Sequence, residues 1–177
     1  ASDAYFGSTV SLSSDGTIVA IGAFNTTGSS SYSGKTSIYE YNGSSWSQLG
    51  ADISGEAAND KSGYNVALSS DGTIVAIGAR FNDGGGSNSG HTRIYEYNGS
   101  SWSQVGGDID GEASNDESGF SVSLSSDGTI VAIGALYNDG GGSNSGHTRI
   151  YEYDGSSWNQ VGSDIDGEAA GDNAGFD

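Results

Sequence analysis

The apolar residues of this chain fall into short runs separated by polar turns. In the middle of the chain, Tyr64–Ser69 (YNVALS) alternates between apolar and polar residues, which is the period of a half-buried strand. A turn at Ser70–Gly72 joins it to Thr73–Ala79 (TIVAIGA), which is apolar on both faces, as in a strand buried between two layers. Two more runs, Thr92–Tyr97 (TRIYEY) and Ser101–Val105 (SWSQV), follow a Gly/Asn/Ser loop and an Asn-Gly turn. The pattern predicts four short antiparallel strands, and no segment has a helical period of useful length.

The same four-strand pattern occurs three times. The string SSDGTIVAIGA recurs so that its aspartates, Asp15, Asp71 and Asp127, are 56 residues apart. Residues 57–112 and 113–168 align without a gap and differ at 10 of 56 positions, whereas the first copy diverges more. Four strands in a unit of this length are typical of a β-propeller blade. We therefore predict an all-β chain of three tandem, four-stranded antiparallel propeller-type blades without appreciable helix.

The period also divides the chain. The predicted blades are residues 1–56, 57–112 and 113–168, with no linker or shift in composition between them. Residues 169–177 (AAGDNAGFD) repeat the opening of the third unit, so we expect them to start a fourth repeat or to form a closing strand. The chain begins without Met and without a signal peptide, and we expect it to be a mature or excised part of a longer protein.

Within each blade, the inner and middle strands are expected at Val10–Ser13 and Thr17–Ala23 and at the equivalent residues of the other copies. The hydrophobic core is expected to use four positions of each copy, which are Val19, Ile21, Ile38 and Trp46 in the first.

Composition excludes several functions. The chain has 5 Lys plus Arg against 23 Asp plus Glu, which gives a net charge of −18. Such a chain cannot neutralise nucleic-acid phosphates, and an anionic membrane surface would repel it. No run approaches the roughly 18 apolar residues of a membrane span, and without cysteine there is neither a disulfide nor a thiolate metal site. Only 33% of residues are hydrophobic, but ten Tyr, three Trp and the Ile/Val runs favour a folded chain.

Several short motifs together resemble one known repeat family. They are Phe6-Gly7-x-x-Val10, the Ile-Gly-Ala ending of the second strand, Gly34 with Ile38-Tyr39, and the following Trp46. This pattern, present three times over the whole chain, resembles FG-GAP repeats, the blades of integrin α-subunit propellers and of many bacterial and algal surface proteins. The resemblance implies a seven-bladed propeller, calcium in some blade loops, and adhesion or ligand binding. One departure is that the other copies read Gly63-Tyr64 and Gly119-Phe120, with the aromatic moved one place.

An acidic segment recurs at the end of each unit and is a candidate metal site. Oxygen ligands at alternate positions around a glycine, as in DIDGE at 108–112, suit a hard cation such as Ca²⁺. The spacing does not match an EF-hand loop, and solvated loops between blades explain the same residues. Both interpretations therefore stay open. The candidate calcium ligands are Asp52, Asp60, Asp108, Asp110, Asp116, Asp164, Asp166 and Asp172.

The histidines and the glycine-rich loops do not indicate catalysis. His91 and His147 occupy one position in consecutive copies, which Lys35 fills in the first copy. A group repeated once per blade is typical of a surface or inter-blade contact, and no unique Ser–His–Asp set can be chosen. The loop at 82–86 (NDGGG) has no following Lys and no following helix, so we expect a flexible connection between strands and not a phosphate-binding loop. We expect that the protein is not an enzyme.

Two surface features remain. The Tyr-Glu-Tyr segments, each followed by a Trp, could bind carbohydrate by stacking, although packing between blades explains them more simply. Three sequons, at Asn25, Asn42 and Asn98, are candidate glycosylation sites, and the last two lie in equivalent predicted turns.

These features favour an extracellular or cell-surface structural or adhesive repeat protein. Three blades cannot close a ring with normal packing, since closed propellers have about four to eight. Terminal units of an open stack expose apolar faces, so we expect self-association into a ring or a filament. The alternative is a lectin-like or calcium-dependent module that binds a carbohydrate or protein ligand.

Overall fold

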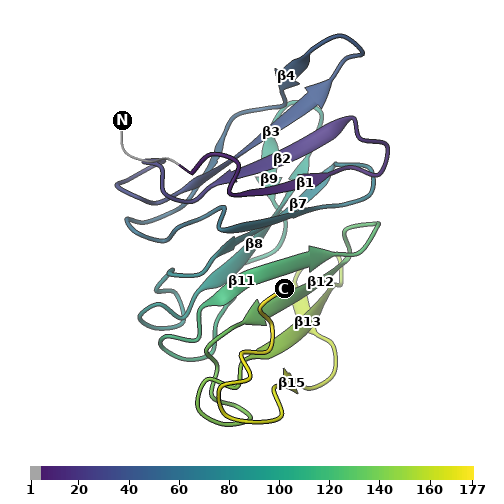
Figure 1. The fold of residues 1–177 in the computed structure, drawn as a ribbon. Helices are drawn as coiled ribbons and strands as arrows, with labels where there is room; N and C mark the ends of the chain where they lie inside the picture. Colours follow the sequence, from purple (N-terminus) through teal and green to yellow (C-terminus); the bar gives the residue numbers. More distant parts are fainter. Residues whose placement is uncertain (1–4) are drawn as a thin grey trace.

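The computed structural model describes residues 5–177, and within that range it contains fifteen strands and no helix (Figure 1). The strands form three antiparallel sheets of similar topology. The first sheet contains β1 (Thr9–Leu12), β2 (Ile18–Ala23), β3 (Lys35–Tyr41), β4 (Trp46–Gln48) and β5 (Ile53–Ser54). The second contains β6 (Asn65–Leu68), β7 (Ile74–Ala79), β8 (His91–Tyr97), β9 (Trp102–Gln104) and β10 (Ile109–Asp110). The third contains β11 (Ser118–Leu124), β12 (Ile130–Ala135), β13 (His147–Tyr153), β14 (Trp158–Gln160) and β15 (Ile165–Asp166).

Each sheet is a propeller-type blade, which confirms the predicted all-β fold class. In the first blade the strand order is β1-β2-β3-β4, and β5 pairs with β3 beyond the end of β4. The outermost position is therefore shared by two short strands. Of the two interpretations of the acidic segments, solvated loops between blades do not account for Asp110 and Asp166, because these residues lie within β10 and β15.

The blades follow one another along the molecule, as the change of colour in Figure 1 shows. Their first strands lie side by side, and the turns that follow these strands are joined directly. The Ser14 amide donates to the Ser70 carbonyl, and the Ser70 amide donates to the Ser126 carbonyl, each at 2.8 Å. We call the contact between the first and second blades the first seam, and the contact between the second and third blades the second seam. These equivalent bonds hold successive blades in the same relation at both seams.

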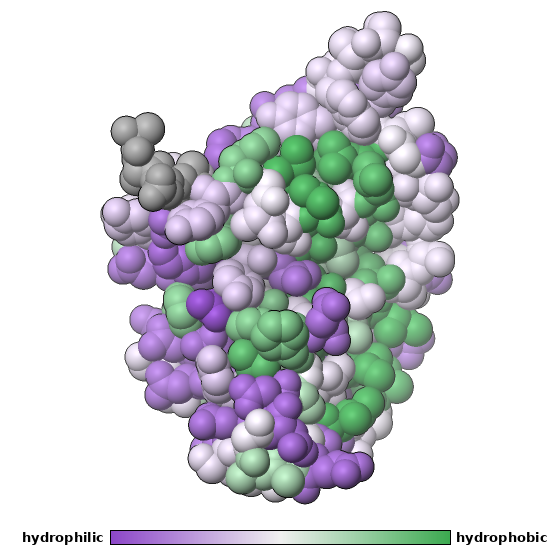
Figure 2. All heavy atoms as spheres, viewed as in Figure 1, coloured by the Kyte–Doolittle hydropathy of each residue, from purple (hydrophilic) through white to green (hydrophobic). Residues whose placement is uncertain are grey.

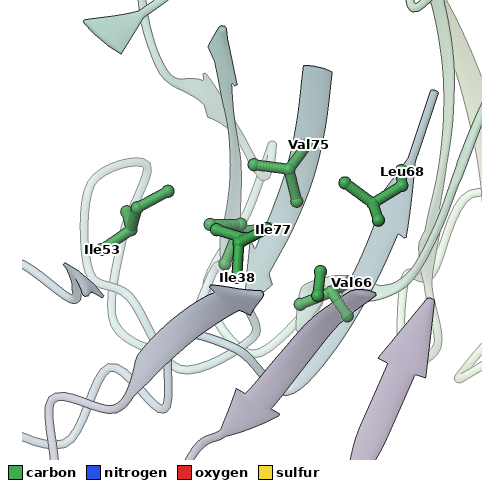
Figure 3. Close-up of a cluster of buried hydrophobic side chains, with 7 residues drawn as sticks. Ile38, Ile53, Val66, Leu68, Val75 and Ile77 are labelled. Carbon is green, nitrogen blue, oxygen red and sulfur yellow. The ribbon is translucent and has the colours of Figure 1, made fainter. Parts of the chain in front are cut away.

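The hydrophobic core lies between blades and not within one. At the first seam, residues of the first blade pack against β6 and β7 of the second (Figure 3). Strand β7 serves both seams because its side chains alternate: Val75 and Ile77 face the first blade, while Ala76 faces the third. This explains why the second strand of each copy is apolar on both faces. The buried members of the first cluster are Ala20, Ile38, Ile53, Val66, Leu68, Val75 and Ile77.

The expected core was right for Ile38 and wrong for Trp46, while Val19 and Ile21 are only half-buried. Trp46 is 47% exposed, because no blade among the described residues packs on this side of the first blade. Its equivalent Trp102 is half-buried, and its indole N–H donates to the Leu49 carbonyl of the first blade at 2.8 Å. Trp158 makes the same bond to Val105, at 2.9 Å. The tryptophan is therefore a seam residue.

The Ile-Gly-Ala motif has its glycine where two blades meet. A Cβ atom on Gly78 would lie 2.9 Å from the carbonyl carbon of Gly119 in the next blade and nearer still to its oxygen. Gly22 and Gly134 face Gly63 and Gly175 in the same way. Only a residue without a side chain allows the two backbones this approach.

Aromatic rings form a ladder across the seams. Phe24 and Tyr64 have ring centroids 5.3 Å apart, Tyr64 and Phe120 5.1 Å, and Phe120 and Phe176 5.5 Å. The Arg80 guanidinium lies 4.1 Å from the centroid of Tyr64. The aromatics that follow Gly63 and Gly119 thus pack between blades in tilted pairs.

Candidate functional site

The repeated histidine lies at the start of the third strand of its blade. His91 pairs with Ala79 of β7 on one side and with Asp110 of β10 on the other. With strands on both sides its side chain is only 1% exposed, as is that of His147. Of the two roles expected at this position, a surface or an inter-blade contact, burial excludes the first.

The buried imidazole faces carboxylates that it does not reach. His91 Nδ1 has no hydrogen-bond partner among the described residues. It is 3.8 Å from Asp108 Oδ2 and 3.9 Å from Asp110 Oδ1, both beyond hydrogen-bond length. The Gln104 amide donates to the other oxygen of Asp108 at 2.6 Å and orients that carboxylate.

A third carboxylate reaches this group from the connection between blades. Ligand atoms of Glu56, His91 and Asp108 all lie within 4.8 Å of one another. Arg93 holds Glu56 in place, with Nη1 at 3.1 Å from Glu56 Oε1, while its Nη2 donates to the Ser54 carbonyl at 3.1 Å. Glu56 follows the last strand of the first blade, so the group spans the seam.

The group is repeated at the next seam. His147 Nδ1 also lacks a partner and lies 3.6 Å from Asp164 Oδ2 and 3.9 Å from Asp166 Oδ1. Glu112 completes this second group and is held by Arg149 at 3.1 Å. We call the two sets the His–carboxylate clusters: Glu56, His91 and Asp108 at the first seam, and Glu112, His147 and Asp164 at the second.

Electrostatics keep these histidines neutral. Burial lowers the pKa of His91 to about 4, and the positive charge of Arg93 acts in the same direction. The negative charge of Asp108 raises this pKa and offsets only part of the decrease. Burial and Arg149 likewise lower the pKa of His147. Near neutral pH both imidazoles therefore have a free nitrogen lone pair.

The first blade has an ion pair at the equivalent position. Lys35 Nζ lies 2.5 Å from Asp52 Oδ2, and the Ser37 hydroxyl donates to Asp52 Oδ1 at 2.7 Å. Ser54 replaces the second aspartate.

The eight predicted acidic ligands separate into two groups. Asp52, Asp108, Asp110, Asp164 and Asp166 lie at or beside the position of the repeated histidine. The other three, Asp60, Asp116 and Asp172, close the turn that follows. Asp116 Oδ2 accepts from the Ala113 amide at 3.1 Å and from Asn138 at 2.8 Å, and Asp60 accepts equivalent bonds.

Sequence reasoning placed Glu56 and Glu112 in the acidic segments considered for calcium, but it did not assign the two histidines to a metal site. The strict recurrence of His91 and His147 was the available signal.

The sequons differ in exposure. Asn42 and Asn98 lie in exposed turns, where each side-chain oxygen accepts backbone amides at 3.0 Å. Asn25 is half-buried, and its side-chain oxygen accepts from Lys61 Nζ at 2.5 Å. Glycan attachment stays a prediction.

Two apolar faces are open at the ends of the described array. The leading face belongs to the first blade and consists of Phe6, Val10, Leu12 and Trp46. It borders a hollow of about 280 Å³ that Val19, Ile21 and Tyr39 also line. Apolar side chains gather around β1 and β2 in Figure 2.

The trailing face belongs to the third blade and consists of Ile130, Val161 and Ile165. Ile165 is 57% exposed, whereas its equivalent Ile109 is 6% exposed because the third blade packs on it. On the leading face, Leu12 is 59% exposed, against 9% for its equivalent Leu68. Each end face is thus a copy of one side of an internal seam.

Comparison with known proteins identifies the repeat. The family model described as FG-GAP repeat matches residues 51–95 and 109–151. A search of curated proteins found no match.

Among solved structures, a protein named as a 6-phosphogluconolactonase from Bacteroides uniformis is similar with a TM-score of 0.57 and 11% identity. The alignment covers 89% of this chain and 40% of that one, and at this identity it indicates fold alone. An acylaminoacyl peptidase from Pyrococcus horikoshii gives a TM-score of 0.39 at 14% identity, covering 82% of this chain and 23% of that one. In the part of the chain that the structure describes, no helix is able to cross a bilayer.

Proposed function

The chain is an FG-GAP-type repeat protein, and on that premise we propose that it is an extracellular structural or adhesive protein whose copies join head to tail. In this joint the trailing face of one copy packs against the leading face of the next. The observation that supports it is the correspondence between these faces and the two sides of the internal seams.

The joint would repeat contacts that already exist within the chain. Val10 and Leu12 would take the positions of Val66 and Leu68, which are buried by the first blade. Trp46 would take the position of Trp102 and donate its indole N–H to the carbonyl of Val161, the equivalent of Leu49. No new surface is needed for this association.

The energetics favour a joint that depends on concentration. Seven large apolar side chains would be covered, and each is already partly buried, so a gain of about 1 kcal/mol apiece is reasonable. The resulting sum of about 7 kcal/mol is comparable with the roughly 4–15 kcal/mol of freedom lost on association. Seam hydrogen bonds such as Ser14 to Ser70 would add to it.

Assembly then takes one of two forms. Two copies would supply six blades, within the range of about four to eight that closed propellers use. A head-to-tail contact that does not close would give a filament. The acidic surface and the exposed sequon turns at Asn42 and Asn98 are compatible with a secreted location.

A single substitution tests the proposal. Leu12→Asp places a charge on the leading face, and Ser44→Asp adds the same charge in an exposed turn that contributes no side chain to either face. We expect the wild type and Ser44→Asp to form rings or filaments in negative-stain micrographs at micromolar concentration, and Leu12→Asp to give particles of 17.8 kDa. Wild-type protein that stays at 17.8 kDa throughout would refute the joint.

A ligand-binding module is the second candidate, and one observation favours it. Tyr41 and Trp46 are both exposed, with ring centroids 5.3 Å apart, and could stack on a sugar. Binding of a glycan by the wild type, lost in Trp46→Ala, would support this function. We propose no catalytic role, because the titratable groups of the site recur from blade to blade.

A further inference from the structure

The two buried histidines pose a problem that the fold does not solve. A buried polar atom without a partner destabilises the folded state, and the chain has the same unpartnered Nδ1 at both seams. The nearest acceptors, Asp108 and Asp164, are held away by Gln104 and Gln160, each of which donates to its aspartate at 2.6 Å. Because the same arrangement occurs twice, we infer that a bound group lies between the imidazole and the carboxylate.

The spacing fits an inserted metal ion. Bonds of about 2.0–2.2 Å from nitrogen and oxygen to a tetrahedral ion place the two ligand atoms roughly 3.3–3.6 Å apart. The nitrogen and oxygen are 3.8 Å apart in the first cluster and 3.6 Å apart in the second. They are too far apart for a hydrogen bond and within a small side-chain movement of the distance that an ion requires.

Charge also favours a divalent cation. Around His91, three carboxylates are set against the single Arg93 guanidinium, so the surroundings of the neutral imidazole have a net charge of about −2. The carboxylates of Asp108 and Asp110 are partly exposed, so an ion can reach the cluster from solvent.

The first blade provides an internal comparison. There, Lys35 replaces the histidine, and its ammonium group pairs with Asp52. In the copy without histidine, the aspartate is therefore paired with a cationic side chain. In the two copies with histidine, the equivalent aspartate has space beside it for a cation.

We propose that each His–carboxylate cluster binds one divalent transition-metal ion of the zinc class, which links the two blades at its seam. Histidine nitrogen with carboxylate oxygens is a donor set for such ions, with the fourth position open to Asp110 or to water. Calcium, implied by the family resemblance, fits less well, since it takes six to eight oxygens and does not favour imidazole. Glu56 comes from the connection that leads out of the first blade, while His91 and Asp108 belong to the second, so the ion bridges the seam.

The test is titration of the metal-free full chain with ZnCl₂ alone and with CaCl₂ alone, followed by calorimetry and by the melting temperature. We expect two zinc ions per chain, a higher melting temperature with zinc, and much weaker binding of calcium. Co²⁺ in place of zinc should give the visible absorption of a tetrahedral site. Stoichiometry is counted per chain, so the result is independent of whether copies associate.

The matched variants copy the first blade. His91→Lys and His147→Lys introduce the residue that the chain itself uses at this position, so they should fold and form ion pairs with Asp108 and Asp164. We expect one zinc ion per chain in each single variant and none in the double variant. The proposal is overturned if the wild type binds no zinc, if it binds calcium more tightly, or if the double variant keeps both ions. If the double variant does not fold, the two single variants provide the test. Two zinc ions per chain in either single variant would also overturn the proposal.

Discussion

The glycine at the end of the second strand gives the sharpest test of how the blades pack. Gly78→Ala adds one methyl group at the second seam. That methyl would lie closer than 3.0 Å to the Gly119 carbonyl oxygen, where ordinary contacts are 3.4 Å or more. Both partners are backbone in adjoining sheets, so the clash cannot be relieved by rotating a side chain.

The cost follows from that geometry. Overpacking a well-packed site typically costs about 1–3 kcal/mol, and a clash between two backbones belongs at the upper end. For a domain of this size, about 3 kcal/mol lowers the melting temperature by roughly 6–12 °C. The matched control is Gly107→Ala, because a Cβ there meets nothing within 4 Å and the first copy already has Ala51 at this position.

Thermal unfolding followed by circular dichroism measures both variants. Gly107→Ala should melt within about 2 °C of the wild type, since its contribution is limited to backbone entropy. If Gly78→Ala also melts within that range, the blades do not approach as closely as described, and the explanation of the Ile-Gly-Ala motif is wrong.

Three further predictions concern single residues. Trp102→Phe removes the hydrogen bond to Leu49 at the seam and should lower the free energy of unfolding in urea by about 1 kcal/mol. Trp46→Phe should leave the free energy of unfolding of the separate chain almost unchanged, and equal losses in the two variants would contradict the seam assignment. Hydrogen bonds from the Ser125 hydroxyl and from Thr129 hold the pKa of Asp127 at about 2. Because this folded pKa is below the unfolded one near 3.9, the stabilisation is present above pH 4 and lost as pH falls towards 2. The melting-temperature difference between wild type and Asp127→Asn should therefore shrink over that window, and a constant difference would refute it. Protein secreted from a eukaryotic host should carry glycan mass that is lost in Asn42→Gln and Asn98→Gln. An intact mass equal to that of the bare polypeptide would exclude glycan attachment at these residues.

Local chemistry made much of the fold predictable. The Ser-Asp-Gly turn is defined by Asp71, which accepts from the Ser69 hydroxyl and the Thr73 amide, so the hairpin on either side could be predicted to within about a residue. The two-residue strands β5, β10 and β15 could not, because an Ile with one polar neighbour has no measurable period. Their pairing with the third strand is a tertiary effect.

The candidate site was predictable only in part, for a related reason. Asp108 and Asp164 were predicted from their spacing, but the chain reverses before Asp116 and directs that carboxylate to its own turn and to Asn138. His91 is paired on one side with β10, a strand that the sequence does not reveal. Trp46 is exposed because no described blade packs against it, whereas Trp102 is half-buried by the first blade. The local sequences of the two residues match, so the sequence alone could not distinguish them.

The most direct test of the head-to-tail joint uses the absence of cysteine from the chain. At the first seam, the Leu68 amide donates to Ser11 Oγ at 3.0 Å, so cysteines at these two positions should form a disulfide within one chain. The equivalents on the end faces are Leu12 and Ser123. In Leu12→Cys/Ser123→Cys, the joint predicts disulfides between copies, seen on a non-reducing gel as covalent multiples of 17.8 kDa. If the Ser11→Cys/Leu68→Cys control cross-links internally while the end-face variant stays monomeric under the same oxidation, the joint does not form.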